Sequence, residues 1–298
     1  MLIRKWNARE GYGEAIGHHG ELIQGVFEGP EGNLHRGLVS LPCRHLKSRA
    51  KFWLHGEAGV SVTPGHCEKS KRAAELVLQT FGGGRTGGHL VIVSNIPIGR
   101  GMGSSTADVL ASILAVFDSL HSHVTPDILM QIAVSAETAC DSTLFTQVAV
   151  LFAQREGKVV EAFKKPLPLL DLISVDAAAG LTIDTLTFEP ARYTSFEIEL
   201  FRPLRSALRK AIEDSDHDLL GRVASASTCI NERFLEKPRL NEIKAIGTRH
   251  GSVGTQVAHS GTVVGLMYDP ANEKSAENIE LAMHALRMSG FEPEFIPH

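Results

Sequence analysis

This 298-residue sequence has few cysteines and no excess of basic over acidic residues, and each of these two features excludes classes of protein. The four cysteines, Cys43, Cys67, Cys140 and Cys229, are far apart and form no C-x-x-C pair, so we expect neither a zinc site nor a disulfide framework. The formal net charge is −4, which gives the chain no electrostatic footprint for nucleic acid. We therefore expect reduced thiols and no nucleic-acid partner.

Long hydrophobic runs are also missing. Residues 109–117 form one of the longest runs, whereas a membrane-spanning helix needs roughly 20 apolar residues. The first ten residues, MLIRKWNARE, contain neither an apolar segment nor a small-residue cleavage site, so they do not resemble a signal peptide. The sequence predicts a cytoplasmic protein with no membrane partner, present as a monomer or a homodimer.

The chain does contain enough apolar sequence for a large core. Hydrophobic residues make up 43% and charged residues 21%, which is typical of a folded protein with one large or two smaller domains. The lysine- and proline-rich stretch 164–168 is the best candidate linker. We therefore predict domains at residues 1–165 and 166–298.

Hydrophobic periodicity and turn residues predict the elements of both domains. In the first domain we expect short strands and turns over 2–62, a helix at 69–80, a strand at 89–96, a glycine-rich turn at 97–103, helices at 105–120 and 125–139, and a hairpin of strands 144–152 and 159–163. In the second we expect strands at 169–175 and 196–201, helices at 203–213, 216–235 and 239–249, strands at 253–258 and 262–268, a helix at 272–289 and a strand at 291–296. This mixture predicts the α+β class, with a ferredoxin-like layer in the second domain.

A glycine-rich turn joins the predicted strand at 89–96 to the helix at 105–120. Gly99, Gly101 and Gly103 stand at every second position of it. Glycine adopts positive φ and lets the backbone approach a ligand without a Cβ clash. Such a turn at a helix amino terminus points free N–H groups and the positive end of the helix dipole at an anion. The pattern therefore favours phosphate binding.

The hydroxyl residues that follow the turn have two interpretations. Ser104, Ser105 and Thr106 can reach phosphate oxygens or a magnesium ion. Alternatively, Ser105 with Asp108 three residues later fits a capping box, which requires no ligand. The Walker motif and the Rossmann glycine spacing are both missing, so two other nucleotide sites are excluded.

The string P-I-G-R-G-M-G-S-S-T-A at residues 97–107 resembles the second motif of the GHMP kinase superfamily, roughly P-x-G-x-G-L-G-S-S-x-A, with Met102 in place of leucine. The resemblance implies the two-domain GHMP kinase fold, with a ribosomal protein S5 domain 2-like N-terminal domain, a ferredoxin-like C-terminal domain and ATP between them. It implies Ser105 as the hydroxyl on the Mg²⁺ side. The implied ATP contacts are Pro97, Gly99, Arg100, Gly101, Met102, Gly103, Ser104, Ser105 and Thr106.

Two carboxylates, Glu137 and Asp141, fall near the carboxyl end of a predicted helix. The helix dipole disfavours a carboxylate there by roughly 0.3–1 kcal/mol, and a bound cation would offset that cost. The alternative is an exposed Glu137 and an Asp141 that caps the next element. By resemblance, Glu137 binds Mg²⁺ and Asp141 is the catalytic residue that orients or deprotonates the acceptor hydroxyl. The pattern E-x-x-x-D-S-T-x-F at 137–145 is similar to the L-threonine kinase branch, and homoserine kinases lack this aspartate.

The segment G-H-H-G-E-L-I-Q-G at residues 17–25 resembles the first motif of the L-threonine kinases of cobalamin synthesis, P-G-x-x-G-E-L-x-Q-G. By that resemblance Glu21 and Gln24 lie against the acceptor. Ile16 replaces the motif proline, and no lysine stands where other branches carry one. His18 is nearest to that position, so the group that assists Asp141 stays open. On spacing alone, the adjacent histidines are ordinary surface or core residues rather than metal ligands.

The segment A-H-S-G-T-V-V-G at residues 258–265 lies between two predicted strands. By itself it is a hairpin turn. It resembles the third GHMP motif, a small-residue loop that packs against the phosphate loop, and the resemblance implies substrate contacts for His259 and Ser260. The basic cluster Lys69, Lys71 and Arg72 is interpreted as a solvated helix face.

These resemblances predict a kinase that moves the γ-phosphate of ATP to a small hydroxy amino acid, with L-threonine giving O-phospho-L-threonine. Homoserine, another hydroxy acid or a sugar are alternative acceptors on the same fold. A nucleotide-binding regulator without turnover is a further alternative, but it would need the phosphate loop and not Asp141.

Overall fold

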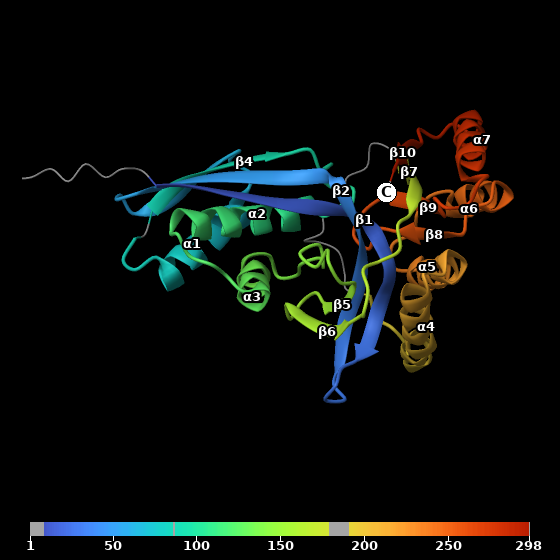
Figure 1. Ribbon diagram of the computed structural model, residues 1–298, viewed down its shortest axis with the longest axis horizontal. Helices are drawn as coiled ribbons and strands as arrows, with labels where there is room; N and C mark the ends of the chain where they lie inside the picture. Colours follow the sequence, from blue (N-terminus) through green and yellow to red (C-terminus); the bar gives the residue numbers. More distant parts are fainter. Residues whose placement is uncertain (1–8, 86, 179–190, 298) are drawn as a thin grey trace, which may run out of the picture.

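The computed structural model describes residues 9–85, 87–178 and 191–297 (Figure 1). The first half contains strands β1 (Arg9–Glu28), β2 (Leu34–His55), β3 (Gly59–Thr63), β4 (Gly87–Ser94), β5 (Val150–Ala153) and β6 (Lys158–Ala162), and helices α1 (Glu68–Phe81), α2 (Ser104–Ser119) and α3 (Pro126–Glu137). The second half contains β7 (Asp171–Asp176), α4 (Ser195–Asp214), α5 (His217–Asn231), α6 (Leu240–Arg249), β8 (Gly254–Val257), β9 (Val263–Tyr268), α7 (Ser275–Met288) and β10 (Glu294–Ile296). The mixed α+β class is confirmed.

One sheet runs through both halves in the order β10-β7-β9-β8-β1-β2-β4-β3, and beside this order β5 pairs with β2 and β6 pairs with β5. β1 and β2 are antiparallel and form a long bent ribbon (Figure 1). The two halves of the sheet meet at a single pair, Glu21 opposite Val257. This narrow junction places the first-motif segment of β1 beside the strand that precedes the third motif.

The ribbon corrects the expectation of several short strands over 2–62. β1 and β2 are long, and register shifts after Ile16, His18 and Glu21 interrupt the alternation of β1. Each shift changes which face a side chain points to, so the sequence alternation breaks although the strand continues. The register shifts therefore reset which face of the sheet the side chains of the first motif point to.

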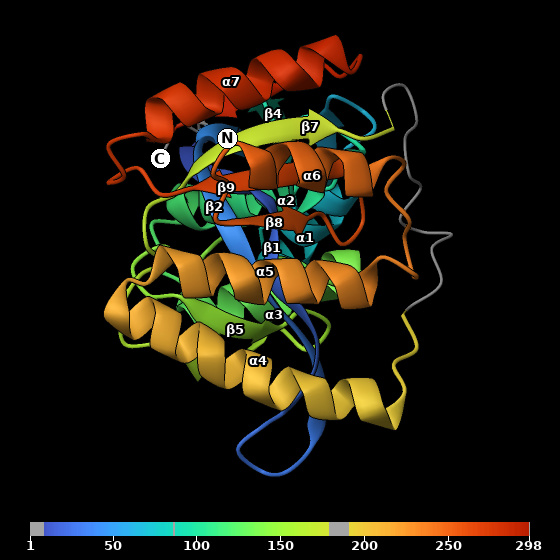
Figure 2. The same cartoon turned by 90° about the vertical axis from the view of Figure 1, so that its right-hand side faces the viewer.

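The helices cover the sheet on one side in each half. In the first half α1, α2 and α3 bury a core that includes Phe52, Leu110 and Met130. In the second half α4 to α7 lie side by side in front of the strands (Figure 2). None of the helices in the described ranges is both long and apolar enough to cross a bilayer.

The strand predicted at 196–201 is wrong, because these residues belong to α4. The alternating string Phe-Glu-Ile-Glu-Leu looks like a strand, but a capping box between Thr194 and Glu197 starts a helix at Ser195. Phe201, Leu208 and Ile212 then recur at helical spacing and are buried. The first hairpin strand also begins later than predicted, at Val150, because residues 142–145 form a turn.

The helix predicted at 203–213 is present but begins at Ser195, and residues 2–8 of the first predicted strands lie outside the described residues. The other predicted elements are confirmed to within a few residues, including both strands around the third motif. The boundary at residue 165 stays a prediction.

Candidate functional site

A cleft of about 760 Å³ opens between the two halves. Its wall is formed by the glycine-rich loop, by residues 137–141 before β5, by residues 257–260 after β8, and by side chains from β1, β2 and the α5–α6 connection. Segments distant in the sequence therefore meet around one volume that is large enough for a nucleotide and a small second substrate.

The glycine-rich loop has the geometry that its sequence requires. Gly99, Gly101 and Gly103 have φ values of 75°, 78° and 77°, in the left-handed region that favours glycine. Gly103 is the N-cap of α2, and no side chain caps this helix end. The capping-box interpretation of Ser105 is therefore wrong. The first amides of α2 remain for a ligand, and they carry the positive end of the helix dipole.

The loop is held by close backbone packing on two sides. The amide of His18 donates a hydrogen bond to the carbonyl of Met102 at 3.1 Å. A Cβ on Gly103 would collide with the His18 ring, and a Cβ on Gly261 would collide with the backbone of Arg100. The third motif therefore packs against the phosphate loop as the resemblance implied.

Glu137 is buried and lies directly behind the start of α2. Its two carboxylate oxygens accept hydrogen bonds from Ser105 Oγ and Thr106 Oγ1, each at 2.7 Å. Burial raises the pKa of Glu137, although these hydroxyls and the Cys140 thiol oppose the increase. The interpretation of Glu137 as an exposed side chain is wrong.

The oxygen pair at this position fits magnesium. Mg²⁺ prefers oxygen ligands and keeps several waters, so one carboxylate and one hydroxyl are a suitable protein contribution. Ser105 Oγ and Glu137 Oε2 are 2.7 Å apart beside the uncapped helix end. A buried carboxylate with a raised pKa is stabilised in its charged form by a divalent cation.

Lys69 was assigned to a solvated face, and the structure corrects this. Its ammonium donates to Ser105 Oγ at 3.2 Å and lies 3.8 Å from Glu137 Oε2. Lys69 occupies the first turn of α1 and lines the cleft, whereas Lys71 pairs with Glu68 on the same helix. The three basic residues lie within four positions of the sequence. Only the packing of α1 against α2 determines that Lys69 faces the cleft and Lys71 does not.

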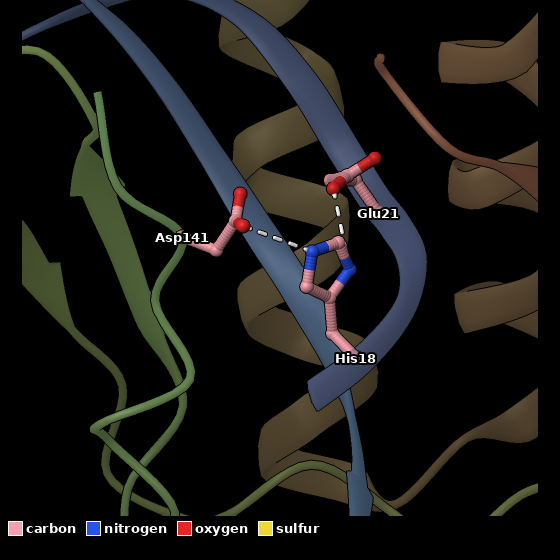
Figure 3. Close-up of side chains that lie close together, drawn as sticks. All are labelled: His18, Glu21 and Asp141. Carbon is pink, nitrogen blue, oxygen red and sulfur yellow. Dashed lines mark ion pairs between the residues drawn. The ribbon is translucent and has the colours of Figure 1, made fainter. Parts of the chain in front are cut away.

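Asp141 pairs with His18, the residue nearest to the position where other branches carry the motif lysine. Nε2 of His18 lies 3.1 Å from Asp141 Oδ2, and Nδ1 lies 3.5 Å from Glu21 Oε1 and 3.3 Å from the carbonyl of Gly20 (Figure 3). Both ring nitrogens thus face oxygen acceptors, which favours the imidazolium. The carboxylate of Asp141 is thus engaged by His18, and the interpretation of Asp141 as a cap of the next element is wrong.

The charges of this pair stabilise each other in a buried position. Burial lowers the pKa of His18, but Asp141 and Glu21 outweigh it and raise that pKa to about 9. Burial raises the pKa of Asp141, but His18 outweighs it and holds that pKa well below the usual range. Asp141 is therefore ionised and His18 protonated at neutral pH.

Glu21 lies behind the cleft wall rather than on it. Its carboxylate accepts a hydrogen bond from the His259 amide at 2.8 Å and lies 2.9 Å from His259 Nδ1. Burial lowers the His259 pKa, but Glu21 outweighs it and raises that pKa. Gln24, His259 and Ser260 do line the cleft. Asp141, His18, Glu21 and His259 thus form one chain of alternating carboxyl and imidazole side chains.

The remaining predicted loop residues divide into two groups. Gly99, Gly101 and residues 102–106 line the cleft, whereas Pro97 and Arg100 are outside its lining. The Arg100 guanidinium is half exposed and lies 3.4 Å from Asp176 of β7.

Sequence reasoning missed a second group of lining residues: Arg36, Tyr193, Asn231 and Lys237. They come from β2, from the segment just before α4, from the last residue of α5 and from the α5–α6 connection, so no local spacing relates them.

Comparisons with known proteins identify the family. The family description "GHMP kinases N terminal domain" matches residues 68–153, and "GHMP kinases C terminal" matches residues 208–287. L-threonine kinases of Salmonella typhimurium and Citrobacter freundii are each 29% identical to this chain, over 59% and 60% of it. These matches span 58% and 61% of the relatives' own lengths.

The crystal structure of a homoserine kinase from Cytophaga hutchinsonii has the same fold, with a TM-score of 0.70 and 15% sequence identity. The comparison covers 99% of this chain and 96% of that one. The two family domains follow one another in the expected order around the cleft, and the chain belongs to the GHMP kinase family.

Proposed function

We propose that the protein is an ATP- and Mg²⁺-dependent kinase that phosphorylates the hydroxyl of a small hydroxy amino acid, with L-threonine as the acceptor and O-phospho-L-threonine as the product. The observation that carries this proposal is the meeting, in one cleft, of an uncapped helix amino terminus, a buried Glu137 and the His18–Asp141 pair. We further propose that the enzyme is cytoplasmic, a monomer or homodimer, and supplies cobalamin biosynthesis.

The phosphate side of the cleft would bind the triphosphate. The amides at the start of α2 point to one place and are fixed before the ligand arrives, so they stabilise developing charge without reorganisation. Ser105 and Glu137 would hold Mg²⁺, which when bound neutralises charge on the transferring phosphoryl group. Lys69 lies within reach of the same oxygens and adds a positive charge.

Asp141 would position the acceptor. An ionised carboxylate accepts the hydrogen bond of the substrate hydroxyl and aligns its oxygen for in-line attack. Because the pKa of Asp141 is low, it takes up the proton only as the new P–O bond forms. His18 would fix this carboxylate through its contact at 3.1 Å, which is the task of a positioning residue.

The identity of the acceptor rests on two supports. The motifs at residues 17–25 and 137–145 resemble those of L-threonine kinases, and two relatives at 29% identity carry that name. Homoserine is the second candidate, because a homoserine kinase shares the fold over nearly the whole chain.

A coupled ADP-release assay with the purified chain tests both candidates. The panel contains L-threonine, L-homoserine, L-serine, a neutral sugar and no acceptor. We expect the highest kcat/KM with L-threonine and a product with the mass of O-phospho-L-threonine. A rate no higher than the acceptor-free background with every member would refute the kinase proposal, and a preference for L-homoserine would refute the acceptor.

A further inference from the structure

Part of the cleft lining carries positive charge to which the proposed phosphoryl transfer assigns no role. Arg36 of β2 and Lys237 of the α5–α6 connection both line the cleft. In the ranges that the structure describes, neither side chain forms an ion pair with a carboxylate. By contrast, Lys69 lies against Glu137, and His18 against Asp141.

Lys237 is the less expected of the two cations, because it is only 3% exposed. Its ammonium donates a hydrogen bond to the carbonyl of Leu235 at 3.0 Å, which leaves two of its three N–H groups for other partners. The nearby Glu232 accepts from the backbone amide of Lys237 at 2.8 Å instead. A buried ammonium without its own carboxylate is costly unless a ligand supplies the negative charge.

A hydrogen-bonded and aromatic wall joins the same part of the second half to β1. Asn231 accepts a hydrogen bond from the Tyr193 hydroxyl at 2.6 Å and donates to the carbonyl of Gln24 at 3.0 Å. Tyr193 also packs edge-on against Phe234, with ring centroids 5.0 Å apart. Tyr193, Asn231 and Phe234 line the cleft together with Lys237.

The position relative to Gln24 indicates which ligand the cation serves. The first-motif resemblance implies that Gln24 lies against the acceptor. Gln24 and Lys237 both line the cleft, and the Gln24 carbonyl accepts the hydrogen bond from Asn231. The ligand group near Lys237 would thus belong to the acceptor rather than to the triphosphate.

We propose that Lys237, together with Arg36, binds the carboxylate of the acceptor, so that the enzyme selects hydroxy acids and rejects neutral alcohols. This inference rests on the proposed kinase function and adds to it the residues that recognise the acid group. An Arg guanidinium and a Lys ammonium provide the charge-assisted hydrogen bonds that a carboxylate requires.

Kinetics with two acceptors test the subsite. L-threonine amide keeps the hydroxyl and the amine and replaces the carboxylate with a neutral group of the same shape. For the wild-type protein we expect a KM for L-threonine at least tenfold below that for the amide. In Lys237→Gln the KM for L-threonine should increase by at least tenfold, with kcat and the KM for ATP within twofold of wild type. The matched control is Lys164→Gln, whose lysine is 83% exposed outside the cleft, and it should leave all three values unchanged.

The outcomes separate this inference from the proposed function. Equal KM values for L-threonine and its amide in the wild type would overturn the subsite without any variant. A Lys237→Gln effect on the KM for ATP alone would assign the cation to the nucleotide and also overturn it. If the wild type transfers no phosphate, the kinase proposal fails by itself. Calorimetric titration of both ligands in the presence of Mg·ADP still tests the subsite, since equal affinities would refute it.

Discussion

At the scale of single residues, the site is organised by buried charges that are paired before any ligand binds. His18 lies between two carboxylates, and Glu21 lies between two histidines. A buried charge needs such partners, because its loss of hydration is otherwise uncompensated. The pairing therefore explains how Asp141 stays ionised and fixed in a water-poor part of the cleft.

Replacement of His18 tests its role as a positioning residue. We expect His18→Gln to lower kcat by about 10²-fold with little change in the KM for ATP, because Asp141 loses the charge that fixes it. His18→Lys restores a positive charge and should recover part of the rate. Steady-state kinetics of both variants provide the measurement, and a His18→Gln enzyme with wild-type kcat would exclude the role.

The same pair predicts a pH dependence of stability. The pKa of His18 is raised from 6.5 to about 9, so its stabilisation is fully present below pH 6.5 and is lost as the pH rises through about 9. Thermal melts of wild type and His18→Gln should therefore differ most near pH 6 and converge toward pH 9 to 10. A difference in Tm that stays constant over this range would contradict the assignment of an imidazolium.

Glu137 permits a prediction about magnesium. Glu137→Gln keeps the size of the side chain, but it removes the negative charge and leaves one oxygen, instead of two, to accept from Ser105 and Thr106. We expect the Mg²⁺ concentration for half-maximal rate to rise about 10–100-fold. The exposed Glu57→Gln is a suitable control. Titration of the rate with Mg²⁺ decides the matter, and superimposable curves would remove Glu137 from the metal site.

At the scale of elements, the glycine-rich loop and the start of α2 were predictable, because local geometry determines both. Alternate glycines permit positive φ at three positions, and the free amides of an uncapped helix end need a partner.

The strand predicted at 196–201 was wrong because a local signal was overlooked. Alternation over five residues does not distinguish a strand from the exposed start of a helix. The capping box of Thr194 and Glu197 is the local signal that identifies the helix.

The loop offers a test that separates backbone strain from collision. Gly103→Ala places a Cβ at positive φ and against the His18 ring, whereas Gly59→Ala places one at φ 95° in open space. Strain alone costs roughly 1–2 kcal/mol, so both variants should be destabilised, but only Gly103→Ala should also raise the KM for ATP by about tenfold or more. Comparable KM values for the two variants would mean that the approach of Gly103 to His18 is unimportant.

At the scale of the whole molecule, the site could be predicted only in part, since it is assembled from both halves of the sheet. Glu137 and Asp141 belong to one local motif, residues 137–145, and could therefore be predicted as site residues. Arg36 and Lys237 are 201 positions apart and follow no spacing rule, so only the packing of the second half against β1 and β2 brings them to one cleft. The distribution of the site over both halves raises the question of whether either half folds without the other.

The hydrophobic core indicates that neither half folds without the other. One buried cluster contains Phe27 of β1, Leu151 of β5 and Phe201 of α4, and the rings of Phe27 and Phe201 are 5.4 Å apart. A fragment of residues 1–165 would expose its side of this cluster to water, at a cost of roughly 25 cal/mol for each Å² of apolar surface. We expect this fragment alone to aggregate or to give no cooperative thermal transition, and co-expression with residues 166–298 to yield a soluble complex. A cooperative melt of the isolated fragment would show instead that the predicted boundary at residue 165 separates two independent folding units, and that the shared core is an interface between them.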